Sequence, residues 1–136
     1  MKGLAIADDS GLCVESLGGA PGVKSARFAG RSKNDKSNNL KVLELLNKSR
    51  SISRRAKFVC AVALADNGKI VKVIEENCRG VIAPEARGHR GFGYDSIFMI
   101  PGLGRTFGQL GLKTKDKMSH RSKALKKARA FLRKYL

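Results

Sequence analysis

Residues 57–74 read KFVCAVALADNGKIVKVI, two apolar runs separated by three turn-forming residues. A continuous apolar run, rich in Val and Ala, ends at Asp66-Asn67-Gly68, and β-branched residues resume from Ile70 to Ile74. Asn and Gly readily adopt the left-handed backbone of tight turns, so these three residues predict a turn between two paired strands. The stretch therefore predicts a central β-hairpin.

Other elements flank this hairpin along the chain. Helical spacing of apolar residues predicts one amphipathic helix over 34–48 and another that begins after the N-cap Ser119. Shorter apolar or glycine-rich runs predict a strand at 4–7, a loop at 18–22 and a strand at 97–100. Alternation of strands and helices around a hairpin predicts an α/β or α+β fold.

Length and composition indicate an ordinary globular chain. The 136 residues predict a single domain, 1–136, with a core of its own. No run approaches the roughly 18 apolar residues of a membrane span, so no membrane partner is expected. The three cysteines are scattered along the chain, which indicates reduced thiols in a cytoplasmic protein and not a disulfide frame or a zinc site.

The net charge of +17 is the unusual feature of the composition. It indicates an anionic partner, either a nucleic acid or a phosphorylated small molecule. Residues 113–136 carry ten lysines and arginines against one aspartate, so much of the charge lies on the last predicted helix. The alternative is that this helix presents only a solvated basic face.

Asp8-Asp9-Ser10-Gly11 places two carboxylates directly after an apolar run. One interpretation is a turn, because Asp, Ser and Gly are common turn residues. The other is a site for a hard cation such as Mg²⁺, which takes carboxylate oxygens and makes two adjacent negative charges tolerable.

Two further segments carry residues suited to a ligand. In Gly91-Phe92-Gly93-Tyr94-Asp95 the glycines allow close approach, the aromatics can stack on a flat ring and the Asp can accept a hydrogen bond; the alternative is a glycine-rich turn with core aromatics. Lys115 and Ser119-His120-Arg121 place cations at a helix start, where backbone N–H groups favour anions, although such residues also occur on plain surfaces. Together the three segments offer what a nucleoside triphosphate needs: Mg²⁺, a base slot and phosphate donors.

The segments ADDSGLCVESLGGAPGVKSARFAG (7–30), GFGYDSIF (91–98) and SHR (119–121) closely resemble the inosine triphosphate pyrophosphatase family. The resemblance runs from about Leu4 to the C-terminus. It implies an elongated α/β fold with a mixed twisted sheet flanked by helices, usually as a homodimer. It also implies Mg²⁺-dependent hydrolysis of ITP, dITP or XTP to the monophosphate and pyrophosphate, which keeps these nucleotides out of nucleic acids.

The resemblance also assigns roles to residues. Asp9 matches the proton acceptor and metal ligand, with Asp8 supporting the metal. The implied substrate contacts are Ser10, Phe92, Gly93, Tyr94, Asp95, Lys115, His120 and Arg121.

The chain departs from the family pattern in three places. Ser96 stands where proline is usual, and Lys113-Thr114 replace an acidic pair. The family's phosphate loop, of the form Ser/Thr-x-Asn-x-x-Lys, and a further acidic metal ligand would precede residue 7, which predicts an N-terminally truncated chain with weak or no activity. Two alternatives stay open: a non-catalytic nucleotide-binding remnant, and a basic nucleic-acid-binding protein, which is less favoured because no nucleic-acid motif is present.

Overall fold

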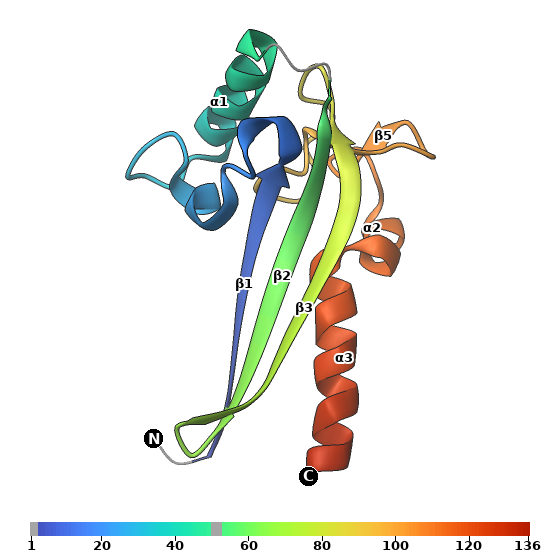
Figure 1. Cartoon of the computed structure of the whole chain (residues 1–136). Helices are drawn as coiled ribbons and strands as arrows, with labels where there is room; N and C mark the ends of the chain where they lie inside the picture. Colours follow the sequence, from blue (N-terminus) through green and yellow to red (C-terminus); the bar gives the residue numbers. More distant parts are fainter. Residues whose placement is uncertain (1–2, 50–52) are drawn as a thin grey trace.

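Three long antiparallel strands form the body of the molecule: β1 (Leu4–Val14), β2 (Arg55–Asp66) and β3 (Lys69–Ile82) (Figure 1). The computed structural model describes residues 3–49 and 53–136. Two short strands, β4 (Phe98–Ile100) and β5 (Arg105–Thr106), extend the sheet in the order β1-β2-β3-β4-β5. The α/β expectation is confirmed, but every pairing among the described residues is antiparallel and not mixed, because each strand pairs with the next strand along the chain.

The predicted hairpin is confirmed. Asp66 pairs with Lys69, and the two residues between them, Asn67 and Gly68, have φ angles of 50° and 82°. Positive φ at both central residues matches the twist of the flanking strands, and Asn-Gly is the dipeptide best suited to it. β3 runs to Ile82, well past the predicted Ile74, because its polar residues alternate with buried ones on the sheet.

β1 corrects the turn interpretation of the acidic pair. The strand continues to Val14 and not to Ala7, and Asp8 and Asp9 lie inside it, opposite Val62 and Ala61 of β2. Eleven consecutive backbone pairings with β2 outweigh the turn preference of Asp, Ser and Gly.

Helices cover the sheet and one of its ends. These are α1 (Asp35–Lys48), α2 (Leu112–Met118) and α3 (His120–Tyr135), with two 3₁₀ turns at Glu15–Leu17 and Gly22–Arg27. Both long helices were predicted, and both N-caps are present: Asn34 accepts a hydrogen bond from the Ser37 N–H, and Ser119 accepts one from the Ser122 N–H. None of the helices in the described residues has the length and apolar character that a membrane crossing requires.

α3 lies along one face of the strands and ends near the β2–β3 turn, where the Tyr135 hydroxyl donates to Asp66 at 2.6 Å (Figure 1). Its buried residues are His120, at its start, and Ala124 and Ala128, which pack on Cys60, Val62, Leu64 and Ile74. The small alanines let the helix approach the sheet closely. Leu125, the neighbour of Ala124 on this helix, is 42% exposed.

A larger cluster fills the opposite end of the molecule, between α1, the sheet and the segment after β3. Its members include Leu12, Val42, Leu46, Phe58, Tyr94, Ile97, Phe98 and Phe107. The rings of Phe58, Phe98 and Phe107 contact one another with centroids 4.4 to 6.0 Å apart. This cluster forms the floor on which the candidate site is built.

Candidate active site

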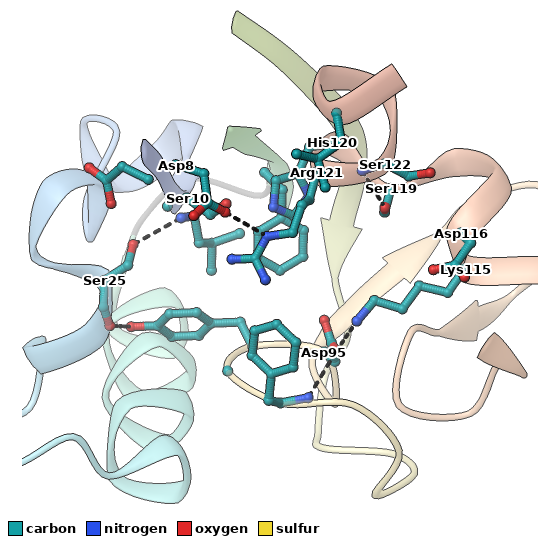
Figure 2. A pocket seen from close by; sticks show the side chains of 18 of the residues that line it. Asp8, Ser10, Ser25, Asp95, Lys115, Asp116, Ser119, His120, Arg121 and Ser122 are labelled. Carbon is teal, nitrogen blue, oxygen red and sulfur yellow. Dashed lines mark hydrogen bonds and ion pairs between the residues drawn. The ribbon is translucent and has the colours of Figure 1, made fainter. Parts of the chain in front are cut away.

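A cleft of about 780 Å³ lies between the middle of β1, the loop before β4 and the start of α3 (Figure 2). Every site residue predicted from the sequence lines it: Asp8, Asp9, Ser10, Phe92, Gly93, Tyr94, Asp95, Lys115, His120 and Arg121. These residues come from three segments that are far apart in the chain. The fold thus brings the three segments together, while the role of each residue stays a prediction.

The acidic pair is split between the two faces of β1. Residues that pair across two strands share a face of the sheet. Asp8 and Ser10 pair with Val62 and Cys60, which pack against α3, so both lie on the α3 side. Asp9, between them, points to the other side. Both carboxylates still reach the cleft, because β1 is the edge strand of the sheet that the described residues form.

Asp8 faces a cation from α3. Its Oδ2 lies 3.2 Å from Nε of Arg121, with the two side chains 43% and 41% exposed (Figure 2). The contact is a charge pair without hydrogen-bond alignment, since Arg121 Nε has no hydrogen-bond partner among the described residues. An ion pair at this exposure is worth about 1 kcal/mol or less, so Arg121 is readily released to an incoming anion.

The loop 91–95 is held by Asp95. The buried carboxylate accepts from Lys115 Nζ at 2.5 Å and from the Phe92 N–H at 3.0 Å. A Cβ on Gly91 would come within 2.0 Å of Asp95 Oδ2, so a side chain at this position would displace the Asp95 carboxylate. Asp95 therefore fixes both the loop and the position of the Lys115 ammonium.

Phe92 is the aromatic that a ligand can reach. Its ring is 61% exposed, and the charged groups of Lys115 and Arg121 lie 4.9 and 5.5 Å from its centroid. A flat, π-rich ligand can stack on such a ring, with two cations beside it.

Tyr94, in contrast, is a core residue. It is 5% exposed, and its hydroxyl donates to the Ser25 carbonyl at 2.6 Å. Burial, together with the negative charge of Asp35, raises the pKa of the Tyr94 phenol. The alternative of a core aromatic thus describes Tyr94, whereas the stacking hypothesis suits Phe92.

His120 closes the floor of the cleft. Its ring stacks on Phe58 with centroids 4.8 Å apart and planes 18° apart. Burial, reinforced by the positive charges of Arg121, Lys115 and Lys123, lowers the pKa of the imidazole to about 4. His120 is therefore neutral near pH 7, and it meets a ligand as a hydrogen-bonding group and not as a cation.

Besides Arg121 Nε, which faces Asp8, two buried polar atoms of cleft-lining residues have no hydrogen-bond partner among the described residues: Ser10 Oγ and His120 Nδ1. An unpartnered buried polar group is unfavourable by about 1–3 kcal/mol, so two in one cleft indicate a ligand that supplies their partners.

Ser25 is a structural member of the site that sequence reasoning missed. Its Oγ accepts from the Leu12 N–H at 2.9 Å and donates to the Gly22 carbonyl at 2.6 Å. A Cβ on Gly11 would lie 2.6 Å from that same carbonyl oxygen, so glycine allows β1 to meet the second 3₁₀ turn, Gly22–Arg27. Ser25 lies inside the quoted segment 7–30, but no local pattern distinguishes it from other serines.

Mg²⁺ in proteins is commonly held by one or two carboxylates together with substrate phosphates and water. Asp8 and Asp9 supply such oxygens at the cleft, and Asp8 already balances a positive charge. Within residues 3–49 and 53–136, no group of three or more His, Cys, Asp and Glu side chains could hold a metal. Because the two side chains leave opposite faces of β1, an ion held by both would lie at the edge of the strand and complete its shell with substrate oxygens and water.

Comparison with known proteins agrees with the geometry. The sequence model of the Ham1 family matches residues 1–131. A protein of Desulforamulus reducens named dITP/XTP pyrophosphatase is 49% identical over 129 residues, which are 95% of this chain and 64% of that protein. The Bacillus subtilis protein of the same name is 47% identical over 124 residues, covering 91% and 63%. The chain thus spans just under two thirds of these curated relatives.

Solved structures match as well. The Ham1 protein of Staphylococcus aureus superposes with a TM-score of 0.92 at 40% identity, covering all of this chain and 70% of that one. A HAM1 protein from Coxiella burnetii gives a TM-score of 0.89 at 40% identity, covering 97% and 68%. The resemblance found in the sequence is confirmed, and the chain that builds this cleft belongs to the Ham1 family.

Proposed function

We propose that the cleft binds purine nucleoside triphosphates with a 6-keto base, such as ITP, dITP and XTP, and hydrolyses them to the monophosphate and pyrophosphate. The observation that carries the proposal is the convergence of carboxylates, an exposed aromatic ring and several cations in one cleft. The relatives named dITP/XTP pyrophosphatase support the reaction class and favour it over nucleic-acid binding.

The base lies on Phe92 in this proposal, with Lys115 at its edge. A 6-keto oxygen accepts a hydrogen bond from the Lys115 ammonium, which Asp95 holds in place. Adenine presents an amino donor at the same position, so its binding leaves two donors facing each other. A mismatch of this kind discriminates by about 1–3 kcal/mol.

The phosphates lie along β1 and the start of α3. Arg121 leaves its loose pair with Asp8 and donates to phosphate oxygens, and Ser10 Oγ supplies a further donor. Asp9 takes the proton from the water that attacks phosphorus. Asp8 and Asp9 would hold Mg²⁺, which when bound neutralises charge on the triphosphate.

The test is pyrophosphate release from ITP, dITP, XTP and ATP in the presence of Mg²⁺. We expect at least about tenfold faster release from the 6-keto nucleotides than from ATP, and loss of release in Asp9→Asn. Glu85→Gln is the matched control, since Glu85 is an exposed carboxylate that does not line the cleft. Orthophosphate as the product, equal use of ATP, or no release from any nucleotide would refute the proposal.

The homodimer and the cytoplasmic location that the sequence indicated also stay predictions. Sedimentation of the purified chain tests the first, and localisation of a tagged protein tests the second.

A further inference from the structure

The loop that carries the base-stacking ring is attached to α1 by both backbone polar groups of Gly93. The Gly93 N–H donates to Asp35 Oδ2 at 2.9 Å, and the Gly93 carbonyl accepts from Asn39 Nδ2 at 3.1 Å. Asp35 and Asn39 lie four residues apart, one turn of helix, and therefore on the same face of α1. The sequence alone predicted no functional role for either residue.

The two side chains of α1 have different roles in the attachment: Asn39 supplies the donors and Asp35 the acceptor. Asn39 is 8% exposed, and its Nδ2 is also within 3.3 Å of Ser96 Oγ, so its two N–H groups face the loop. Its buried Oδ1 has no partner among the described residues, which means that the amide is oriented by its donor side alone. Asp35, on the first turn, presents a carboxylate acceptor and also lines the cleft.

The backbone conformation of Gly93 affects the positions of the two groups that contact the base in the proposed function. It has φ of 60°, in the left-handed region, and it follows Phe92 directly. Two residues later Asp95 fixes the Lys115 ammonium. A rotation of the backbone at Gly93 therefore changes the distance between the stacking ring and the cation.

We propose that Asp35 and Asn39 are positioning residues that hold Gly93 and thereby set the base selectivity of the cleft. The inference rests on the proposed function for the identity of the base. They act through their hydrogen bonds to the Gly93 backbone.

The experiment measures IMP and AMP binding by calorimetry for the wild-type chain, Asp35→Ala and Asp35→Asn. Asparagine keeps an oxygen that can accept from the Gly93 N–H, whereas alanine keeps none. We expect Asp35→Ala to lower the preference for IMP over AMP by about three- to tenfold, the value of one hydrogen bond, and Asp35→Asn to stay within about twofold of wild type.

Two further variants complete the design. Glu44→Ala removes an exposed carboxylate from the same helix and should leave the preference unchanged. Asn39→Asp keeps the shape of the side chain but removes both N–H donors, so it should reduce the preference at least as much as Asp35→Ala. The amide resonance of Gly93 should shift in Asp35→Ala before any nucleotide is added, and Asp35→Asn should restore most of it.

The outcomes distinguish a failure of the proposed function from a failure of the positioning role of Asp35 and Asn39. A wild-type chain that binds IMP and AMP equally overturns the proposed function and this inference with it. A wild-type chain that prefers IMP, with the same preference in Asp35→Ala, overturns the inference alone. Equal losses in Asp35→Ala and Asp35→Asn also overturn it, because the acceptor oxygen would then be irrelevant.

Discussion

His120 should make the stability of the protein depend on pH in a defined window. Its pKa is about 4 in the folded protein against an ordinary value of 6.5, because the ring is buried between Phe58 and a group of cations. Below pH 6.5 the unfolded chain binds a proton that the folded chain does not bind. The free energy of unfolding therefore falls as the pH falls from about 6.5 toward 4, and it is constant above this window as far as His120 is concerned.

The size of the effect follows from the shift. A difference of 2.5 between 6.5 and 4 corresponds to about 3 kcal/mol over the whole window, at about 1.36 kcal/mol per unit. Between pH 7 and pH 5 the loss is about 2 kcal/mol. This is a large part of the stability of a domain of this size.

The assay compares urea unfolding of the wild-type chain and His120→Phe at pH 7 and pH 5. Phenylalanine keeps a ring against Phe58 but cannot take up a proton. We expect the difference in unfolding free energy between the two proteins to change by about 2 kcal/mol in favour of the variant at pH 5. Glu76, whose pKa is lowered by its hydrogen bond with Lys127, titrates alike in both proteins and cancels. A difference that does not change with pH would refute the buried, neutral state of His120.

Three other substitutions test the packing of the site, each by urea unfolding. Gly91→Ala places a methyl group against Asp95 at a φ of 76° and should destabilise the protein by about 2–3 kcal/mol; a change below about 0.5 kcal/mol would contradict the close approach. Lys115→Met leaves the Asp95 carboxylate buried without its cation and should be unfavourable by about 3–5 kcal/mol, so wild-type stability would show that the pair is not coupled. Ser119→Ala removes the cap of α3 on the Ser122 N–H and should be unfavourable by about 1 kcal/mol, and no change would mean that solvent satisfies the N–H equally well.

The sequence could predict the elements whose signals are local. The hairpin turn at Asn67-Gly68 depends on two residues and their flanking strands, and the cap at Ser119 lies within one turn of the helix that it begins. The candidate site could be predicted because its three segments were read together, and the fold indeed brings them to one cleft.

What could not be predicted depends on contacts between distant residues. Asp8 and Asp9 lie in a strand because β2, some 50 residues later, pairs with them, and no local preference shows that partner. Tyr94 is buried because its hydroxyl reaches the Ser25 carbonyl, 69 residues away. Asp35 is an ordinary first-turn acid in the sequence, and its bond to Gly93 exists only in the folded chain.

Mapping where a 6-oxopurine nucleotide binds is the sharpest test of the assignment of the cleft as the nucleotide site. Titration of the isotope-labelled chain with IMP should shift the backbone amides of residues 92–95 and 115–121 most, since 92–95 and Lys115 line the proposed base end of the cleft and 119–121 its phosphate end. The contrasting surface is the separate basic pocket at 23–33, lined by Lys24, Arg27, Arg31 and Lys33, which would attract any phosphate. This assignment predicts saturable shifts in the cleft and only weak, salt-sensitive shifts at 23–33. Dominant shifts at 23–33, with residues 92–95 unmoved, would contradict it.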